Sequence, residues 1–275
     1  MEHLFDKVQE TVAFLHAYTQ SFQPQAGIIL GTGLGNLTDS IEITHEIPYS
    51  EIPHFPVSTV EGHAGRLVFG RLAGKNIVAM AGRFHYYEGY SMQQVTFPIR
   101  VLKYLGIQQL FISNAAGSVN AHMNVGDIVF IRDHINLQPE NPLRGKNDER
   151  FGLRFPDLLN LYNKKLNNKA LQLAKELGIP AHIGVYVATQ GPNLETPAEY
   201  RFFNIIGGDV VGMSTVPEVL VAKHMQLPVW VASVVSNKCF PIEEIAETTV
   251  EEVINAVAQT EPKLSKILTH LLESL

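Results

Sequence analysis

The chain has 275 residues, of which 45% are hydrophobic and 17% charged, and it carries a formal net charge of −6. This composition can fill the core of one large domain or two small ones, and it is unlike that of a disordered chain. The negative charge argues against a nucleic-acid binder, and no apolar run approaches the ~20 residues that span a bilayer. The single cysteine, Cys239, excludes an internal disulfide. The low cysteine content and the lack of a signal-peptide pattern at the N-terminus together lead us to expect a cytoplasmic protein.

The first elements lead into a glycine-rich turn. Apolar spacing predicts a helix over 3–22 and a buried strand over 26–30. The strand runs into Gly31–Gly35, whose backbone N–H groups can face an anion, with the Thr32 hydroxyl as a further donor. The turn fits neither a P-loop nor a dinucleotide fingerprint, so it is a weak phosphate signal, and a simple tight turn is the alternative. Pro and Gly punctuate 41–63, which we expect to be a loop.

A dense polar stretch follows the next pair of strands. Residues 66–69 and 76–81 have the pattern of a hairpin, and Arg83, His85 and Glu88 come directly after it. An arginine presents a rigid fork of donors that suits phosphate, and a histidine can donate or carry a proton near neutral pH. Glu88 is close enough in sequence to orient His85. The alternative is a surface loop with a salt bridge.

The remaining chain alternates between helices and strands. Residues 136–156 form the longest stretch without a pattern, which indicates a functional loop or an interface. The last helix has Thr248 and Glu251 as a candidate capping box and Pro262 as a kink. This alternation predicts one α/β domain over residues 1–275, with a mostly mixed or parallel central sheet flanked by helices. The expected helices are 92–105, 157–177, one from 195, one from 214 and 248–275; the expected strands are 110–113, 127–131, 182–188, 209–213 and 229–235.

Polar residues gather where the apolar strands end or helices begin. In open α/β sheets, ligands bind outside the carboxyl ends of the strands. One polar residue after a strand is usually a capping device, but several that converge on one edge are better explained by a site. The six places are Thr32, Arg83–His85, Asn114, Glu195, Ser214 and Asn237.

The sequence closely resembles the low-molecular-weight, trimeric purine nucleoside phosphorylases. The matching motifs cover nearly the whole chain in the family's order. The resemblance implies a nucleoside phosphorylase fold with a partly barrel-like sheet, and a homotrimer with shared active sites. The motifs include Gly31–Gly35, His63–Arg66, Gly82–Gly89, Asn114–Gly117, Asn141–Gly145, Asn147–Arg150, Gly212–Glu218 and Ser236–Asn237.

The resemblance also implies a reaction and a role for particular residues. Phosphate, a co-substrate, would attack C1′ of a 6-oxopurine nucleoside such as inosine or guanosine; no cofactor or metal is implied. The catalytic residues would be His85, Glu88 and Asn237, with Glu88 as an orienter of His85 rather than a general base. The phosphate ligands would be Thr32, His63, Arg83, His85, Ala115 and Ser214; the base ligands Glu195 and Asn237; and the ribose contacts Tyr87, Met213, Val250 and, from a neighbouring subunit, Phe155.

Three positions depart from the family pattern. Thr32 replaces a frequent serine and keeps its hydroxyl, and Leu194 stands where an aromatic ring often covers the base. Val250 aligns with a histidine that binds the ribose 5′-hydroxyl, and valine cannot form a hydrogen bond. A methylthioadenosine-type phosphorylase is therefore one alternative, and a catalytically silent nucleoside-binding protein is another.

Overall fold

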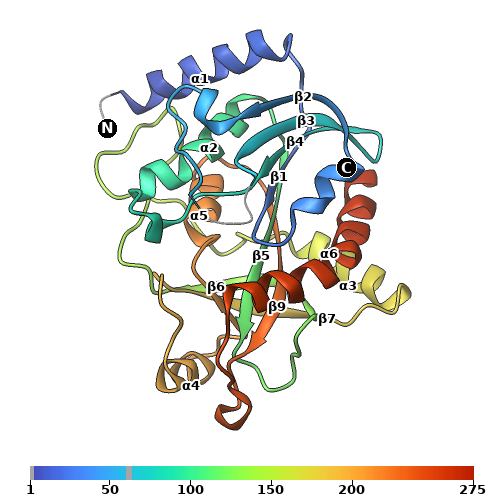
Figure 1. Ribbon diagram of the computed structural model, residues 1–275. Helices are drawn as coiled ribbons and strands as arrows, with labels where there is room; N and C mark the ends of the chain where they lie inside the picture. The colour runs from blue at the N-terminus through green and yellow to red at the C-terminus, as the bar shows by residue number, and fades with distance from the viewer. Residues whose placement is uncertain (1–2, 60–63) are drawn as a thin grey trace.

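The computed structural model describes residues 3–59 and 64–275 (Figure 1). Across these ranges, nine strands form one mixed sheet in the order β2-β3-β4-β1-β5-β8-β7-β6-β9. The strands are β1 Ala26–Leu30, β2 Glu42–Pro48, β3 Arg66–Leu72, β4 Lys75–Ala81, β5 Gln109–Ser118, β6 Ile128–Asn136, β7 Ala181–Ala188, β8 Val210–Gly212 and β9 Val229–Lys238.

The sheet closes on itself at one end. The last strand in the order, β9, also pairs in parallel with β5, so β5, β8, β7, β6 and β9 form a closed ring. Strands β4, β1, β5 and β9 are parallel neighbours, whereas β2 and β3 extend the sheet as antiparallel strands. The structure thus confirms an α/β domain with a mixed, partly barrel-like sheet.

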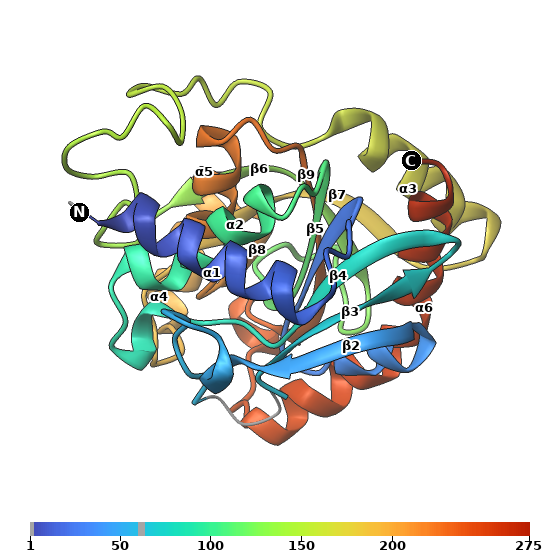
Figure 2. The same ribbon diagram turned by 90° about the horizontal axis from the view of Figure 1, so that it is seen from above.

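Helices cover both faces of this sheet. Figure 2 shows α1, α2 and α5 on one side and α3 and α6 on the other. Because side chains alternate along a strand, Ile29 of β1 joins the core beneath the first group, whereas Ile28 and Leu30 join the core beneath the second. The helices are α1 Leu4–Tyr18, α2 Met92–Tyr104, α3 Lys164–Glu176, α4 Pro197–Ile205, α5 Val216–His224 and α6 Val250–Glu273; the 3₁₀ turns are η1 Gly35–Ser40, η2 Tyr49–Glu51, η3 Tyr86–Glu88 and η4 Ile242–Glu244.

The last helix begins one residue later than its sequence pattern indicates. The capping box is formed by Thr249 and Glu252, not by Thr248 and Glu251, because Thr249 is the residue whose hydroxyl accepts from the N–H of Glu252. The helix contains Pro262, and both views show α6 changing direction along its length (Figures 1 and 2). A proline removes one helical hydrogen bond and clashes with the preceding turn, which accounts for such a bend.

Two other expectations are wrong. Part of the expected loop over 41–63 is the strand β2, whose side chains are largely exposed at the edge of the sheet. The expected helix over 157–177 begins only at Lys164, with Asn163 as its N-cap. Before that point, Tyr162 forms a bridge with Val229 at the start of β9, so the backbone is committed to the sheet.

The helices also bear on membrane association. Over residues 3–59 and 64–275, none combines the length and the apolar character that crossing a bilayer requires.

Candidate active site

All six polar places lie around one cavity of about 160 Å³. The strands β1, β4, β5 and β9 run parallel, so their carboxyl ends meet at one edge of the sheet. The α4 and α5 segments close the cavity from the other side. The lining includes Thr32, Arg83, His85, Asn114, Ala115, Glu195, Met213, Ser214 and Asn237.

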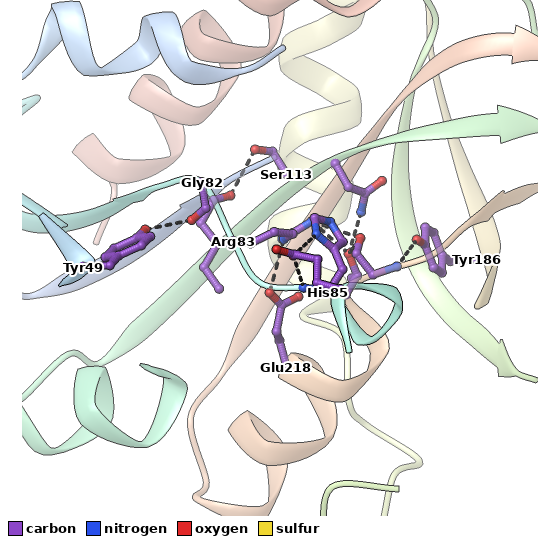
Figure 3. Close-up of polar contacts among 12 residues, drawn as sticks. Tyr49, Gly82, Arg83, His85, Ser113, Tyr186 and Glu218 are labelled. Atoms are coloured by element: carbon purple, nitrogen blue, oxygen red, sulfur yellow. Dashed lines mark hydrogen bonds and ion pairs between the residues drawn. The ribbon is translucent and has the colours of Figure 1, made fainter. Parts of the chain in front are cut away.

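Arg83 is the buried cation of this cavity, with only 1% of its surface exposed. Its Nε atom lies 3.2 Å from Oε1 of Glu218, and its Nη1 atom donates to the Ser214 hydroxyl at 3.0 Å. The guanidinium therefore contacts both Glu218 and Ser214, and Figure 3 shows Arg83 beside Glu218. An arginine fixed in this way presents its donors without a loss of side-chain freedom when an oxyanion arrives.

The start of α5 is held in a strained backbone conformation next to Arg83. Thr215 has a φ of 72°, which is unfavourable for a β-branched residue. Its hydroxyl accepts from Nδ2 of Asn114 at 2.9 Å, and the backbone N–H of Ser214 donates to the Tyr186 hydroxyl at 3.3 Å (Figure 3). Such strain persists only where the surroundings enforce it, and here it turns Ser214 towards the cavity at a helix N-terminus.

His85 and Glu88 form a buried pair beside the cation. The His85 Nδ1 atom lies 3.0 Å from Oε1 of Glu88, which also accepts from the His85 backbone N–H at 2.7 Å. Burial lowers the pKa of His85 below its usual value, although Glu88 opposes this shift. Burial alone would raise the pKa of Glu88, but hydrogen bonds from His85 and Thr59 outweigh it and bring the pKa to about 2. The pair is therefore a neutral imidazole and a carboxylate at neutral pH.

The tautomer of His85 follows from this pairing. A carboxylate only accepts hydrogen bonds, so the neutral ring donates Nδ1–H to Glu88, and Nε2 carries the lone pair. This agrees with the expectation that Glu88 orients His85. The ring of Tyr87 stacks on the imidazole with 4.7 Å between centroids, which fixes the plane of the histidine as well.

The glycine after β1 is explained by a close approach of two strands. A Cβ atom on Gly31 would lie 2.8 Å from the Ser113 carbonyl oxygen and 3.5 Å from Nη1 of Arg83. Only glycine lets β1 pass so near to β5 at this point. The next residue, Thr32, then lines the cavity, as does Ala115 of β5.

Glu195 is the acidic group among the residues that line the cavity. It precedes α4, whose N-cap is Thr196, and its Oε1 atom accepts from the Thr189 hydroxyl at 2.8 Å. Burial raises the pKa of Glu195, and the hydrogen bond from Thr189 only partly offsets this effect. A carboxylate with a raised pKa is ready to accept a donor from a ligand that neutralises its burial.

The amide of Asn237 is held by its neighbours on β9. The Ser236 hydroxyl donates to its Oδ1 atom at 2.8 Å, and its Nδ2 atom donates to the Cys239 sulfur at 3.1 Å. Burial raises the pKa of the Cys239 thiol to about 12, so the sulfur is a neutral acceptor. These contacts orient the amide within the cavity wall.

One expected ligand, Val250, does not line the cavity, another lies outside the described residues, and a third was expected from a neighbouring subunit. His63 lies outside the described residues. Val250, at the start of α6, is 64% exposed and is not part of the lining, and α6 contributes Val253 instead. Phe155 lies in the long loop with 83% of its surface exposed, away from the cavity of its own chain.

Other lining residues were not singled out from the sequence. They include Tyr200, Cys239 and Val253, as well as Ala116 and Gly117. The signal for Tyr200 and Cys239 is weak, because a tyrosine inside an amphipathic helix and a lone cysteine are usually core residues. Within the described ranges, no group of three or more His, Cys, Asp or Glu side chains is placed to hold a metal ion.

The comparisons with known proteins agree with this geometry. A family model described as the phosphorylase superfamily matches residues 25–273. Purine nucleoside phosphorylase 1 of Geobacillus stearothermophilus is 54% identical over 233 residues, which are 82% of this chain and 85% of that protein. The crystal structures of Schistosoma mansoni purine nucleoside phosphorylase in complex with adenosine and with inosine each match at a TM-score of 0.92 and 42% identity. These matches cover 98% of this chain and 97% and 96% of those chains.

The chain belongs to the phosphorylase superfamily and, within it, to the purine nucleoside phosphorylases. These proteins are pentosyltransferases that use phosphate as a co-substrate.

Proposed function

We propose that this protein catalyses the reversible phosphorolysis of 6-oxopurine nucleosides, inosine and guanosine and their deoxy forms. A phosphate oxygen forms a bond to C1′ as the bond between C1′ and the purine nitrogen breaks. The electron pair of the broken bond moves onto the purine, which takes up a proton, and the second product is (deoxy)ribose 1-phosphate. This places the protein in purine salvage.

The phosphate half of the cavity supports this proposal. Arg83 supplies the fixed positive charge, Ser214 lies at a helix N-terminus, and Thr32 lies within the glycine-rich turn. A neutral His85 accepts a hydrogen bond at Nε2, which suits the hydroxyl of hydrogen phosphate. In the transition state the sugar resembles a positively charged oxocarbenium ion. The negative charge of the nearby phosphate stabilises this state more than the ground state, in which the sugar carries no such charge. We propose that the backbone of Ala115 and the residue His63 also bind the phosphate.

The base half supplies what the leaving purine requires. The negative charge that develops on the ring is relieved by donors, and Asn237 has a second N–H beyond the one given to Cys239. Glu195 accepts from N1–H of a 6-oxopurine and so holds the base in register. Tyr87 and Met213 also line the cavity, and we propose that the ribose lies against them.

One observation carries the proposal: a single cavity is lined both by the buried Arg83–Ser214 pair and by Glu195 and Asn237. The test is a panel of inosine, guanosine, adenosine and methylthioadenosine, assayed with and without phosphate. We expect base release from inosine and guanosine only when phosphate is present. Equal cleavage without phosphate would indicate a hydrolase, and binding without turnover would indicate a silent nucleoside-binding protein.

Methylthioadenosine is the second candidate substrate in this panel. The residue that α6 contributes to the wall is the apolar Val253, and Val250 offers no hydrogen bond to a 5′-hydroxyl. An apolar surface there would tolerate a methylthio group. A clear lead for methylthioadenosine over inosine would move the assignment to that class.

We also propose a homotrimer in which each long loop reaches the cavity of a neighbour. The end of this loop and the residues directly after it expose a cluster of large apolar side chains that their own chain does not cover. A cluster of this kind marks an interaction surface. Its members are Leu153, Phe155, Leu158 and Leu159.

A further inference from the structure

A second cavity, of about 810 Å³, lies away from the active site and shares no lining residue with it. It is enclosed by the N-terminal end of α1, by α2, by the last residue of α5 and by residues 142–151 of the long loop. Figure 2 shows these three helices and the yellow-green loop side by side. The cavity therefore lies where the base of the long loop meets the helical layer.

Arg100 of α2 provides a buried positive charge on the wall of this cavity. Arg100 is only 4% exposed, and its side chain has no ion-pair or hydrogen-bond partner among the described residues. Burial lowers the pKa of Arg100 to about 10, despite the nearby Asp148 carboxylate, so the guanidinium stays charged at neutral pH. A buried charge without a counter-ion is costly, and this cost needs an explanation.

The nearest carboxylate is already engaged. Asp148 accepts from Nε and Nη2 of Arg150 at 2.8 and 2.6 Å, in a two-point contact. The guanidinium carbon of Arg100 lies instead 4.3 Å above the ring of Phe151, which holds the arginine plane in place. The N–H groups of the Arg100 guanidinium, which have no partner among the described residues, can therefore bind a group from outside this chain.

The other lining groups favour a negative ligand. His224 is buried, and its Nδ1 atom has no hydrogen-bond partner among the described residues. Burial lowers the pKa of His224, and the charge of Arg100 lowers it further. An anion bound at Arg100 would cancel that second effect. The lining also includes Lys146 and Arg150, against the carboxylates of Asp148 and Glu149.

We propose that this cavity is a second anion site, in which Arg100 binds a small oxyanion, a phosphate or a carboxylate group. The anion neutralises the buried guanidinium and links α2 to residues 142–151. Because Phe155 lies only four residues beyond this segment, an occupied site also steadies the base of the loop that carries it.

The test is a calorimetric titration of the full-length, phosphate-free protein with inorganic phosphate. We expect two phosphate ions per chain. Replacing a charged hydrogen-bonding partner costs about 10- to 100-fold in affinity, so Arg100→Met should abolish one event. In a Ser214→Ala background, in which active-site binding is weakened, the Arg100-dependent event should remain. The matched control is Lys103→Met, a basic residue of the same helix outside the cavity, which should keep both events.

A parallel titration with succinate separates the two sources of the oxyanion. Arg100-dependent binding of succinate assigns a carboxylate ligand, and Arg100-dependent binding of phosphate alone assigns a phosphate ligand. If Arg100→Met does not fold, Arg100→Lys and a crystal soaked in selenate give the same answer, with selenate expected within hydrogen-bond distance of residue 100. The proposal is overturned if neither ligand shows Arg100-dependent binding, or if an acidic side chain of a second copy already occupies the guanidinium.

Discussion

Burial raises the pKa of the Glu195 carboxyl, and this shift links the choice of base to pH. Above its pKa, the carboxylate accepts from N1–H of hypoxanthine, but it faces the lone pair on N1 of adenine. We therefore expect kcat/KM for inosine to exceed that for adenosine by roughly 100-fold near neutral pH, because a buried charge is left unpaired with adenine. As the pH falls towards the raised pKa, the protonated carboxyl can donate to adenine N1, so the ratio should narrow.

The measurement is kcat/KM for both nucleosides from pH 5 to pH 8. In Glu195→Gln, the side-chain amide can offer either a donor or an acceptor, so the ratio should be small and independent of pH. A wild-type ratio that stays constant across this range would remove Glu195 from the discrimination of the base.

Asn237 should act on the leaving group rather than on phosphate. Removing one preorganised hydrogen bond typically lowers the rate by ~10²–10³, so Asn237→Ala should lower kcat on inosine by about that factor. Affinity for phosphate, measured by calorimetry, should hardly change. Ser214→Ala is the contrasting variant, because it should weaken phosphate first. A collapse of phosphate affinity in Asn237→Ala would assign this residue to the other half of the cavity.

The cavity residues that directly follow strands can be predicted from the sequence, because parallel strands bring their carboxyl ends to one edge of the sheet. Thr32, Arg83 and Asn237 were found in this way. Tyr200 and Cys239 were not, because they come together only when α4 packs against the segment that follows β9. Glu218 lies within a recognised motif, but its ion pair with Arg83 depends on the path of α5 after the strained Thr215.

At the scale of elements, the contact between β5 and β9 sets the position of Asn237. A Cβ atom on Gly117 would lie 2.5 Å from the Cys239 sulfur and 3.3 Å from Oδ1 of Asn237, at a register shift between the two strands. We expect Gly117→Ala to lower both Tm and kcat, because the sulfur and the amide must move. Overpacking of this kind typically costs ~1–3 kcal/mol.

The double variant Gly117→Ala/Cys239→Ala is the control, since it removes the sulfur that the new methyl group meets. It should recover most of the lost Tm and part of kcat, as followed by calorimetry and a phosphorolysis assay. If the double variant were no more stable than Gly117→Ala, the steric account of this glycine would be wrong.

The elements that sequence reasoning missed share a physical cause. Strand β2 is an edge strand in which only Ile47, next to its last residue, is buried, so its period-2 signal is faint among prolines. The start of α3 was placed too early because residues 157–163 include leucines with helical spacing. The pairing of Tyr162 with Val229 outweighs that local preference. The five-residue strand β1 was found with correct ends, because all of its residues are buried and contribute to the pattern. The longer strands β5 and β9 run past the ends expected for them at residues 113 and 235.

At the scale of the whole molecule, the exposed Phe155 predicts that activity is shared between subunits. Sedimentation should show a trimer at assay concentrations, and Phe155→Ala should lower activity because the neighbour's cavity loses its cover. Ile43→Ala, which truncates an exposed apolar side chain on β2, is the matched control and should remain active.

Complementation makes this prediction sharper. Phe155→Ala subunits keep their own cavity, and Asn237→Ala subunits keep the loop that would cover it. Refolding a mixture of the two should therefore restore activity above the level of either variant alone. An active monomer, or a mixture that behaves as the simple average, would argue against shared sites.

The closed ring of strands leaves the described part of the sheet with a single open edge. Every strand in it has at least two neighbours except β2, which pairs only with β3. Addition of a foreign strand, the first step of fibrous self-association, can therefore begin only at β2. That edge carries Glu42, His45 and Glu46, has an irregularity between Ile43 and His45 and ends at Pro48, all of which oppose templated growth. Beneath it lies β3, whose Leu67–Phe69 are fully buried, so the solubility of the protein at high concentration depends on β2 staying in place.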